Sequence, residues 1–512
     1  MKSNAVGIYR VDQMELYEDL RAPYDPGADY PELSGRCRTS DRPNVAFEGV
    51  RELFRLLGFD AENYGTPEWN PLGWLIEPGM DVMLKPNLVV SEHPQGERVV
   101  RFTDTDGPVL RAVAEYALLA LRDDGSFTLG DSPIKETEFA TTARILGLDK
   151  VMEDLQGRTK TDVRFIDIRD FVSARAESAP VAGESQAGDP RGYVQYDLAE
   201  RSVLEPVSHL ASKFRSTAAY YENKMGETHA KGVHRYGVSG SLIKSDVFLN
   251  VPKLKTHCKA GVTAALKNLV GMCNEKRWLP HHRMGRPADG GDFYQDGAAT
   301  SLRLIEGVKD TLQRNSAGRF IYPRIMQANR ILRRVSGIDI RRVVRDSDPY
   351  QNGGWHGNDT VWRMVLDLNK VLLYGDAEGV IHESPVARKS FNIVDGLWAS
   401  EGEGPLVPDP KVGGVLLAGH DSTLVDIVGA TAMGFDYRKI KMLCEALTQS
   451  DLPLTRHSVE ELELLSNVAE WSDLEGLGQN HLDFRPPTGW KGFIELDSPS
   501  GGGASESERA TA

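Results

Sequence analysis

A strand, a basic segment and a short helix follow one another at residues 245–286 of this 512-residue chain. The first part is an apolar run that is typical of a buried strand, Val247, Phe248, Leu249 and Val251. Pro252 ends that strand because it has no N–H to donate, and a Gly/Thr turn then precedes a helix predicted over residues 263–270, which ends at Gly271. Such a strand–loop–helix unit is characteristic of α/β proteins and restricts the possible folds strongly.

Basic side chains gather directly after this strand. If the chain stays extended beyond Pro252, Lys253, Lys255 and His257 project to one side, because alternate residues of a strand share a face. They precede the N-terminus of the predicted helix near Thr263, where free N–H groups attract anions. In a chain of net charge -14, this short segment holds a local basic excess, made up of Lys253, Lys255, Lys259, Lys267, Lys276, Arg277, Arg283 and Arg286. We therefore predict that it binds an anion.

Other strands and helices alternate along the chain. An apolar strand at 81–90, an amphipathic helix at 103–122 and a strand at 126–133 give the order of a parallel sheet. We predict an α/β fold with a mostly parallel sheet, helices on both faces and polar insertions. The predicted core is residues 1–440, interrupted by an insertion at about 174–238 and a basic, helical segment at about 299–350. Residues 441–497 form a C-terminal extension, and residues 498–512 form a low-complexity tail that we expect to be disordered.

Composition excludes several classes of protein. A net charge of -14 and a pI near 5.4 argue against a nucleic-acid partner, since a duplex repels a negative protein. No apolar run is long enough to span a membrane, and the N-terminus has no secretory pattern. The cysteines are scattered without a C-x-x-C pair, so we expect a reducing, cytoplasmic location: Cys37, Cys258, Cys273 and Cys444. The sequence leaves open whether the chain forms a homo-oligomer.

Polar residues at the ends of predicted strands are candidate site residues. Lys85 and Asn87 end the strand at 81–90, and Asp131 and Ser132 end the strand at 126–133. The carboxyl ends of parallel strands meet at one edge of a sheet, where α/β proteins bind ligands. Two further candidates for substrate binding, His356 and Arg363, lie in and after the loop that precedes a helix predicted to begin near residue 360. A hydrogen-bonded structural role is the alternative for His356.

Three carboxylates are candidate metal ligands. Asp395 ends a predicted strand, Glu401 lies in a glycine-rich loop, and Asp421 follows another strand. Oxygen ligands of this kind suit a hard divalent cation, so Mg²⁺ or another divalent cation is a candidate cofactor. The alternative is that these residues are turn aspartates and a helix cap. A transition-metal site at His257, His281 and His282 is a further option.

Several motifs resemble the DUF362 family, a widespread prokaryotic group of unknown function. They are LKPNLV, GDSP, NVPKLKTHCKAGVTAALKNLVGMC, VDGLWASEGEGP and LAGHDSTLVDIVGATAMGF, in this order between about residues 81 and 435. The resemblance implies an α/β core, no known reaction, and a shared polar site at Lys85, Asn87, Asp131, Lys253, Lys255, His257, Lys267, Asn268, Asp395, Glu401 and Asp421. Many members carry a ferredoxin-like cysteine module. This sequence lacks those cysteines and resembles a subset without the module, so no iron–sulfur cluster is expected.

The leading functional hypothesis is an enzyme acting on an anionic small molecule, bearing a phosphate or carboxylate, with a divalent cation as a candidate cofactor. Its expected catalytic residues are Lys255, His257 and Lys267, since a buried lysine among other cations becomes a base or nucleophile near neutral pH. Substrate-binding roles fall to Lys85, Asn87, Asp131, Ser132, Lys253, Thr263, Asn268, His356 and Arg363. The alternatives are a metal-independent racemase or isomerase, which uses lysine and histidine proton transfer, and a non-catalytic anion-binding protein.

Overall fold

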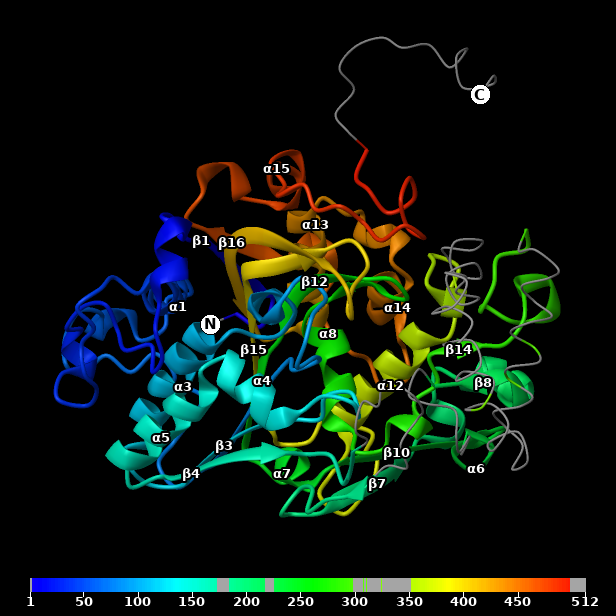
Figure 1. Cartoon of the computed structure of the whole chain (residues 1–512), viewed down its shortest axis with the longest axis horizontal. Helices are drawn as coiled ribbons and strands as arrows, with labels where there is room; N and C mark the ends of the chain where they lie inside the picture. Colours follow the sequence, from blue (N-terminus) through cyan, green and yellow to red (C-terminus); the bar gives the residue numbers. More distant parts are fainter. Residues whose placement is uncertain are drawn as a thin grey trace, which may run out of the picture.

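A computed structural model of the chain describes residues 2–172, 184–216, 225–297 and 351–497, with isolated positions 307, 310 and 324. A ten-stranded sheet runs through the molecule (Figure 1), and its main strand order is β17-β1-β16-β15-β11-β2-β3-β4. The strands are β1 Ala5–Arg10, β2 Asp81–Pro86, β3 Ser126–Asp131, β4 Asp162–Asp167, β11 Val247–Val251, β12 Lys253–His257, β13 Gly261–Thr263, β15 Lys389–Glu401, β16 Asp409–Gly419 and β17 Glu463–Ser466.

Most of this sheet is parallel. Strands β15, β11, β2, β3 and β4 all run in the same direction, whereas β16 is antiparallel to both β15 and β1. At the far edge β17 runs parallel to β1, so the C-terminal extension at 441–497 contributes an edge strand to the main sheet. The structure confirms the predicted α/β fold with a mostly parallel sheet.

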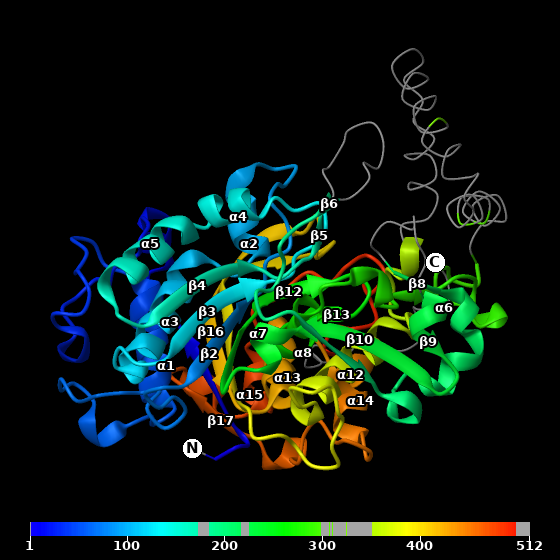
Figure 2. The same ribbon diagram turned by 90° about the horizontal axis from the view of Figure 1, so that it is seen from below.

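Helices cover both faces of the sheet (Figures 1 and 2). On one face lie α1 Val45–Leu56, α3 Gly107–Leu121 and α5 Leu148–Arg158; on the other lie α8 Ala265–Asn268, α12 Val361–Tyr374, α13 Ser422–Met433 and α14 Lys441–Thr448. Alternate residues of β2 point to opposite faces of the sheet. Val82 and Leu84 belong to the core beneath α1, α3 and α5, and Met83 belongs to the core on the other face. Two separate hydrophobic cores therefore hold the sheet between its helices.

Smaller elements surround this framework. They include α2 Val100–Thr103, α4 Phe139–Ile145, α6 Met225–Thr228, α7 Gly240–Ile243, α15 Leu474–Gln479, and the strands β5 Phe171–Val172, β6 Glu184–Ser185, β7 Tyr193–Asp197, β8 Phe214–Arg215, β9 His229–Ala230, β10 Val233–Ser239 and β14 His282–Arg283. In the predicted insertion at 174–238, β7, β10 and β9 form a separate sheet. The basic segment at 299–350, apart from the three isolated positions, and the tail at 498–512 lie outside the described residues.

One long strand positions the lysine-rich segment. The first residues of β15 pair with β11, and its later residues Asp395 and Ser400 pair with Lys253 and Lys255 of β12. The chain thus leaves β11 at Pro252 and continues as a second strand beside the same partner. This arrangement confirms the predicted extended run of Lys253, Lys255 and His257 beyond the end of β11. No helix in the described ranges has the length and apolar character needed to cross a membrane.

Candidate functional site: a buried lysine cluster

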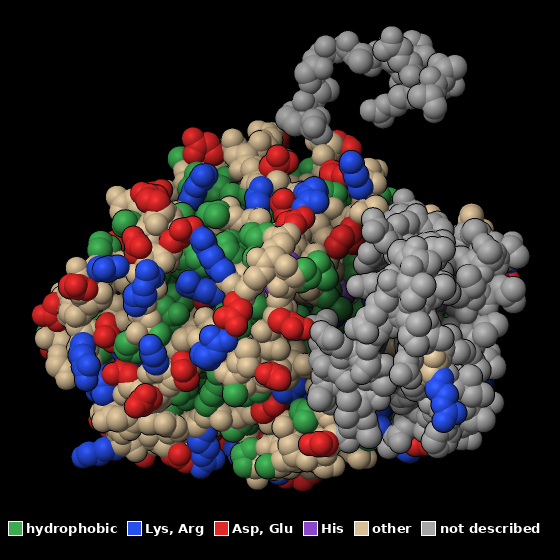
Figure 3. Space-filling model, in the orientation of Figure 1, with side chains coloured by type: hydrophobic (Ala, Val, Ile, Leu, Met, Phe, Trp, Pro, Cys, Tyr) green, Lys and Arg blue, Asp and Glu red, His purple; other side chains and the backbone are tan. Residues whose placement is uncertain are grey.

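Lysines are buried to an unusual extent around β12 and α8. Five of them are at most 6% exposed, namely Lys85, Lys253, Lys255, Lys259 and Lys267. A sixth, Lys276, is half-buried. On the described part of the face in Figure 3, basic and acidic side chains are interspersed. The basic excess of the segment 253–286 is therefore largely an interior feature. A buried ammonium group is costly unless it is paired, so the partners of each lysine indicate its role.

Two of these lysines are fully paired with aspartates. Lys85 Nζ lies 2.8 Å from Asp131 Oδ1 and donates to the Pro86 carbonyl and Asn268 Oδ1 at 2.9 and 3.2 Å. Lys253 Nζ lies 2.6 Å from Asp395 Oδ2 and donates to the carbonyls of Arg101 and Trp398 at 3.1 and 2.7 Å. An ammonium has three N–H groups, and both lysines use all three within the protein. The geometry favours a structural role for Lys85 and Lys253 over the predicted contact with substrate.

The residues around Lys85 attach the segment 268–273, at the end of α8 and after it, to the sheet. Asp131 also accepts the Leu88 N–H at 2.6 Å, and the Ser132 hydroxyl donates to the Cys273 carbonyl at 2.7 Å. The Asn268 amide donates to Asn250 Oδ1 at 2.8 Å. A Cβ on Gly271 would lie 2.1 Å from Asp131 Oδ1, so only glycine fits there. The contacts of Asp131, Ser132 and Asn268 are thus positional.

Lys267 has no such partner. It is 6% exposed, and its Nζ forms no hydrogen bond or ion pair with any described residue. Its electrostatic neighbours are mostly cations, namely Lys255, Lys259 and Lys276. Burial and then these positive charges lower the pKa of Lys267 to about 7. In a substantial fraction of the molecules, Lys267 is therefore a neutral amine at physiological pH, which is the property expected of a catalytic lysine.

The groups around Lys267 are basic too. Burial lowers the pKa of Lys255, Lys259 and Lys276 to about 8. Burial, followed by the charge of Lys267, holds the pKa of His257 and His281 well below the usual range, so both rings are neutral. We call these four lysines and two histidines, Lys255, Lys259, Lys267, Lys276, His257 and His281, the lysine cluster. It unites all three predicted catalytic residues.

The polar contacts of the cluster lysines are few. Lys255 Nζ donates to the Thr103 carbonyl, and Lys276 Nζ donates to the Val270 carbonyl at 2.6 Å. Lys259 Nζ lies 3.0 Å from His282 Nδ1 and also donates to the Asn352 carbonyl. None of the four forms an ion pair with a described carboxylate. The cluster consequently has a surplus of buried basic groups.

Asp104 is a site residue that the sequence analysis missed. It is fully buried, and its Oδ2 accepts the N–H groups of Val89 and Val90 at 3.0 and 3.4 Å, while Oδ1 has no hydrogen-bond partner among the described residues. Burial raises the pKa of Asp104 to about 7, and Lys255 counteracts this shift. Asp104 belongs to a Thr-Asp-Thr-Asp run at 103–106, in which Asp106 caps α3 through the Gly107 N–H. Only the second aspartate of this run has that role.

The predicted anion site at the helix N-terminus is already filled by the protein. Asp426 of α13 accepts the N–H groups of Ala265 and Leu266, the first two residues of α8, at 2.6 and 3.0 Å. Thr263, which precedes α8, keeps a buried hydroxyl without a hydrogen-bond partner in the described part of the chain. Asn87 has a buried, unpartnered Oδ1 as well, whereas its backbone N–H donates to the Thr105 hydroxyl at 2.8 Å. A ligand at this site is expected to contact side chains rather than the α8 N-terminus.

The three predicted metal ligands do not form one site. Asp395 is paired with Lys253, whereas Glu401, six residues and roughly 20 Å further along β15, contacts Arg485 and Lys411. Asp421 caps α13 by accepting the Thr423 and Leu424 N–H groups at 2.9 and 3.1 Å. Within the described ranges no three His, Cys, Asp or Glu residues are grouped to hold a metal ion. The predicted cation site at these carboxylates was therefore wrong.

Replacing Asp421 by alanine should lower the free energy of unfolding by about 1 kcal/mol, because a helix loses its N-cap. Chemical denaturation of the variant, with and without added Mg²⁺, measures this effect. Equal losses under both conditions are expected from a cap. A loss that appears only when Mg²⁺ is present would instead restore the metal role for this residue.

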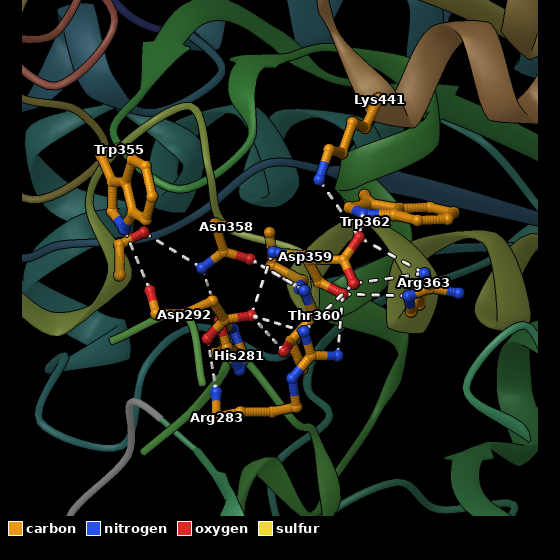
Figure 4. A network of polar contacts seen from close by, with 12 residues as sticks. His281, Arg283, Asp292, Trp355, Asn358, Asp359, Thr360, Trp362, Arg363 and Lys441 are labelled. Atoms are coloured by element: carbon orange, nitrogen blue, oxygen red, sulfur yellow. Dashed lines mark hydrogen bonds and ion pairs between the residues drawn. The ribbon is translucent and has the colours of Figure 1, made fainter. Parts of the chain in front are cut away.

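Arg363 belongs to the polar network around Asp292 and Asp359 (Figure 4). Asp359 forms ion pairs with Arg283, Arg363 and Lys441 at N–O distances of 3.1 to 3.2 Å. Nearby, Asp292 accepts the Thr360 hydroxyl at 2.5 Å, and its carbonyl accepts Trp355 Nε1 at 3.0 Å. These contacts join the loop after β14 to the start of α12. The Arg363 guanidinium is thus engaged in the framework.

The ring of His356 stacks on Phe493, with centroids 4.1 Å apart. Its backbone N–H donates to the Gly489 carbonyl at 3.1 Å. Burial and then the charge of Lys441 lower the pKa of His356, and no cluster lysine contributes to that shift. These contacts attach the C-terminal segment to the loop before α12. The structural alternative therefore describes His356 better than substrate binding does.

Comparisons with known proteins give a family but no activity. Residues 170–431, about half of the chain, match the model described as Domain of unknown function (DUF362). No protein with a curated description matches the chain. A crystal structure of a structural-genomics target from Thermotoga maritima aligns with a TM-score of 0.30 and 10% identity, over 79% of this chain and 58% of that protein. The alignment thus spans less than two thirds of that protein's length, and its score is too low to assign a common fold.

Proposed function

Because the chain belongs to the DUF362 family, whose description assigns no activity, we propose its function from the lysine cluster: it is an enzyme that acts on an anionic small molecule bearing a phosphate or carboxylate. The observation that carries the proposal is Lys267, a buried amine among three other lysines that has no hydrogen-bond or ion-pair partner in the residues the structure describes. Buried positive charges that lack counter-charges destabilise a fold, and a bound anion removes that penalty.

Lys267 is the group to which we assign proton transfer. With a pKa of about 7, its amine is partly neutral near physiological pH and is able to accept a proton or attack a carbonyl carbon. Lys255, Lys259 and Lys276 neutralise the anionic group of the substrate. His257 and His281 are neutral and hence suited to hydrogen bonding rather than to charge pairing.

The same observation supports a metal-independent racemase or isomerase as the second candidate. A neutral amine beside a bound carboxylate is suited to removing a proton from the adjacent carbon, and this step needs no cation. Turnover that depends on added Mg²⁺ would rule out this metal-independent candidate. A protein that binds anions without any pH-dependent turnover would be the non-catalytic alternative.

Anion binding should be coupled to proton uptake. At pH 8 the Lys267 amine is mostly neutral, since its pKa is about 7, and a bound anion raises that pKa. On binding at pH 8, Lys267 is therefore expected to take up nearly one proton per site. The half-protonated Lys255, Lys259 and Lys276, whose pKa values are about 8, add to this uptake, whereas binding at pH 6 takes up almost none. Isothermal titration calorimetry with pyrophosphate and malonate, in buffers of different ionisation enthalpy, measures the number of protons.

A matched control separates Lys267 from general charge effects. Lys150 is an exposed lysine of α5, on the opposite side of the sheet from α8, so Lys150→Met should bind and take up protons like the wild type. Lys267→Met should lose binding of both anions, and the proton uptake with it. If neither pyrophosphate nor malonate binds to the wild type, the proposal of an anionic substrate is wrong.

A further inference from the structure

Three buried oxygens near Lys255 have no hydrogen-bond partner among the described residues. They are Asp104 Oδ1, Thr263 Oγ1 and Ser400 Oγ. All three residues are at most 3% exposed. Buried polar atoms in folded proteins are nearly always hydrogen-bonded, so three unsatisfied oxygens around one lysine require an explanation. A bound ligand that supplies the missing hydrogen bonds is one.

Strand register places two of these oxygens on either side of Lys255. On β12, Lys255 pairs with Thr263 of β13 and with Ser400 of β15. Paired residues on neighbouring strands project from the same face of a sheet. The side chains therefore form a row across three strands, in which a hydroxyl, an ammonium and a second hydroxyl follow one another.

Asp104 approaches the same row from the segment after α2. Lys255 Nζ donates to the carbonyl of Thr103, the residue before Asp104, yet Lys255 and Asp104 do not form an ion pair. The Asp104 carboxylate is held in place by the N–H groups of Val89 and Val90. With one N–H of the ammonium used by Thr103, Lys255 retains two donors, and Asp104 Oδ1 remains an acceptor.

The combination of these groups restricts the ligand. Lys255 only donates and an ionised Asp104 only accepts, whereas the two hydroxyls do both. Because the pKa of Asp104 is about 7, its carboxyl group is mainly ionised above neutral pH. A carboxylate or the dianion of a phosphate ester then has no hydrogen to donate to Asp104 and is repelled by its charge. A hydroxyl group accepts from Lys255 and donates to Asp104 Oδ1, while the rest of the lysine cluster binds the anionic group.

We propose that the substrate is a hydroxylated anion, such as a polyol phosphate, a sugar phosphate or a hydroxy acid, whose hydroxyl groups bind Asp104, Lys255, Thr263 and Ser400. This inference rests on the proposed function, because the lysine cluster must first bind the anionic group. It adds a polar subsite that selects among anions. Asp104 and Thr263 are then specificity residues.

Two pairs of probes test the inference by isothermal titration calorimetry at constant ionic strength. One pair is sn-glycerol 3-phosphate and propyl phosphate, and the other is glycerate and propionate. In each pair the anionic group is kept and only the hydroxyls differ, so the comparison also separates phosphate from carboxylate. The hydroxylated member of at least one pair should bind at least about 10-fold more tightly. A ligand without the hydroxyl groups leaves buried polar groups of the protein unpaired.

Variants connect this preference to the assigned residues. Asp104→Asn should reduce the preference severalfold, because it removes the charge that repels the unhydroxylated anion and weakens the acceptor for the hydroxyl group. Thr263→Val removes one hydroxyl with almost no change in shape, and it provides the same test if Asp104→Asn does not fold. Asp421→Asn, at the N-cap of α13, is the matched control and should keep the full preference, because the Asp421 carboxylate bonds to Thr423 and Leu424.

The outcomes distinguish the inference from the function on which it rests. Equal affinities within both pairs would overturn the hydroxyl subsite and leave the anion site intact. A preference that persists unchanged in both Asp104→Asn and Thr263→Val would overturn the assignment of these residues. If none of the four anions binds to the wild type, the anionic substrate itself is refuted, and the subsite with it.

Discussion

Lys267→Met is expected to abolish anion binding and, at the same time, to make the protein more stable near neutral pH. The affinity for pyrophosphate should fall by about 100-fold or more, since a buried charge partner of the ligand is lost. Stability should rise because methionine fills the same space without a buried amine. The pKa of Lys267 falls from the ordinary 10.5 to about 7 on folding, which corresponds to a few kcal/mol of unfolding free energy.

The lowered pKa of Lys267 also makes the free energy of unfolding depend on pH. Between pH 7 and 10 the unfolded chain binds a proton at Lys267 that the folded chain has released, so wild-type stability rises with pH in this window. The variant should lose about one proton of that dependence, or ~1.4 kcal/mol per pH unit. Urea denaturation from pH 7.5 to 9.5 measures both slopes, with Lys150→Met as the control. An unchanged slope in Lys267→Met would show that the side chain is charged and solvated in the native protein.

Lys253→Met should have the opposite effect on stability. The substitution leaves the Asp395 carboxylate fully buried without its counter-charge, and we expect the free energy of unfolding to fall by about 3–5 kcal/mol. Three strong contacts of Nζ, to Asp395, Arg101 and Trp398, are lost together. Urea denaturation at pH 7 measures the loss.

The double variant Lys253→Met/Asp395→Leu is the control for this prediction. Because it removes both charges, it should recover most of the stability that the single variant loses, and a double-mutant cycle isolates the coupling between the two residues. If Lys253→Met is as stable as the wild type and loses only anion binding, the direct role in substrate binding predicted from the sequence is correct and the structural role is wrong.

The sequence predicted the backbone around the site well, because its signals are local. The apolar run at 247–251, the proline that follows and the glycines around the helix determine β11, β12 and α8 within a few residues. The basic excess also indicated where the site lies. Hydrophobic alternation and turn residues act over short distances, so this part of the fold could be read from one stretch of chain.

The roles of individual lysines could not be predicted in this way. Lys85 and Lys253 look like Lys267 in sequence, but their aspartate partners lie 46 and 142 residues away. Pairing over such separations depends on which strands become neighbours in the sheet. The same is true of Asp104, whose position beside Lys255 follows from the packing of α2 over β12 and β15. A charge count therefore located the cluster but did not distinguish paired from unpaired members.

The switch of β15 from β11 to β12 has a consequence for folding. The Lys255–Thr103 and Lys253–Asp395 contacts join residues 152 and 142 positions apart, so the site exists only after three distant segments have assembled. Contacts of this range form late, because a large loop must close before they stabilise anything. A ligand that binds there recognises the completed sheet alone. Its binding energy therefore adds to the stability of the whole sheet rather than to that of one segment, and ligand binding reports that folding is complete.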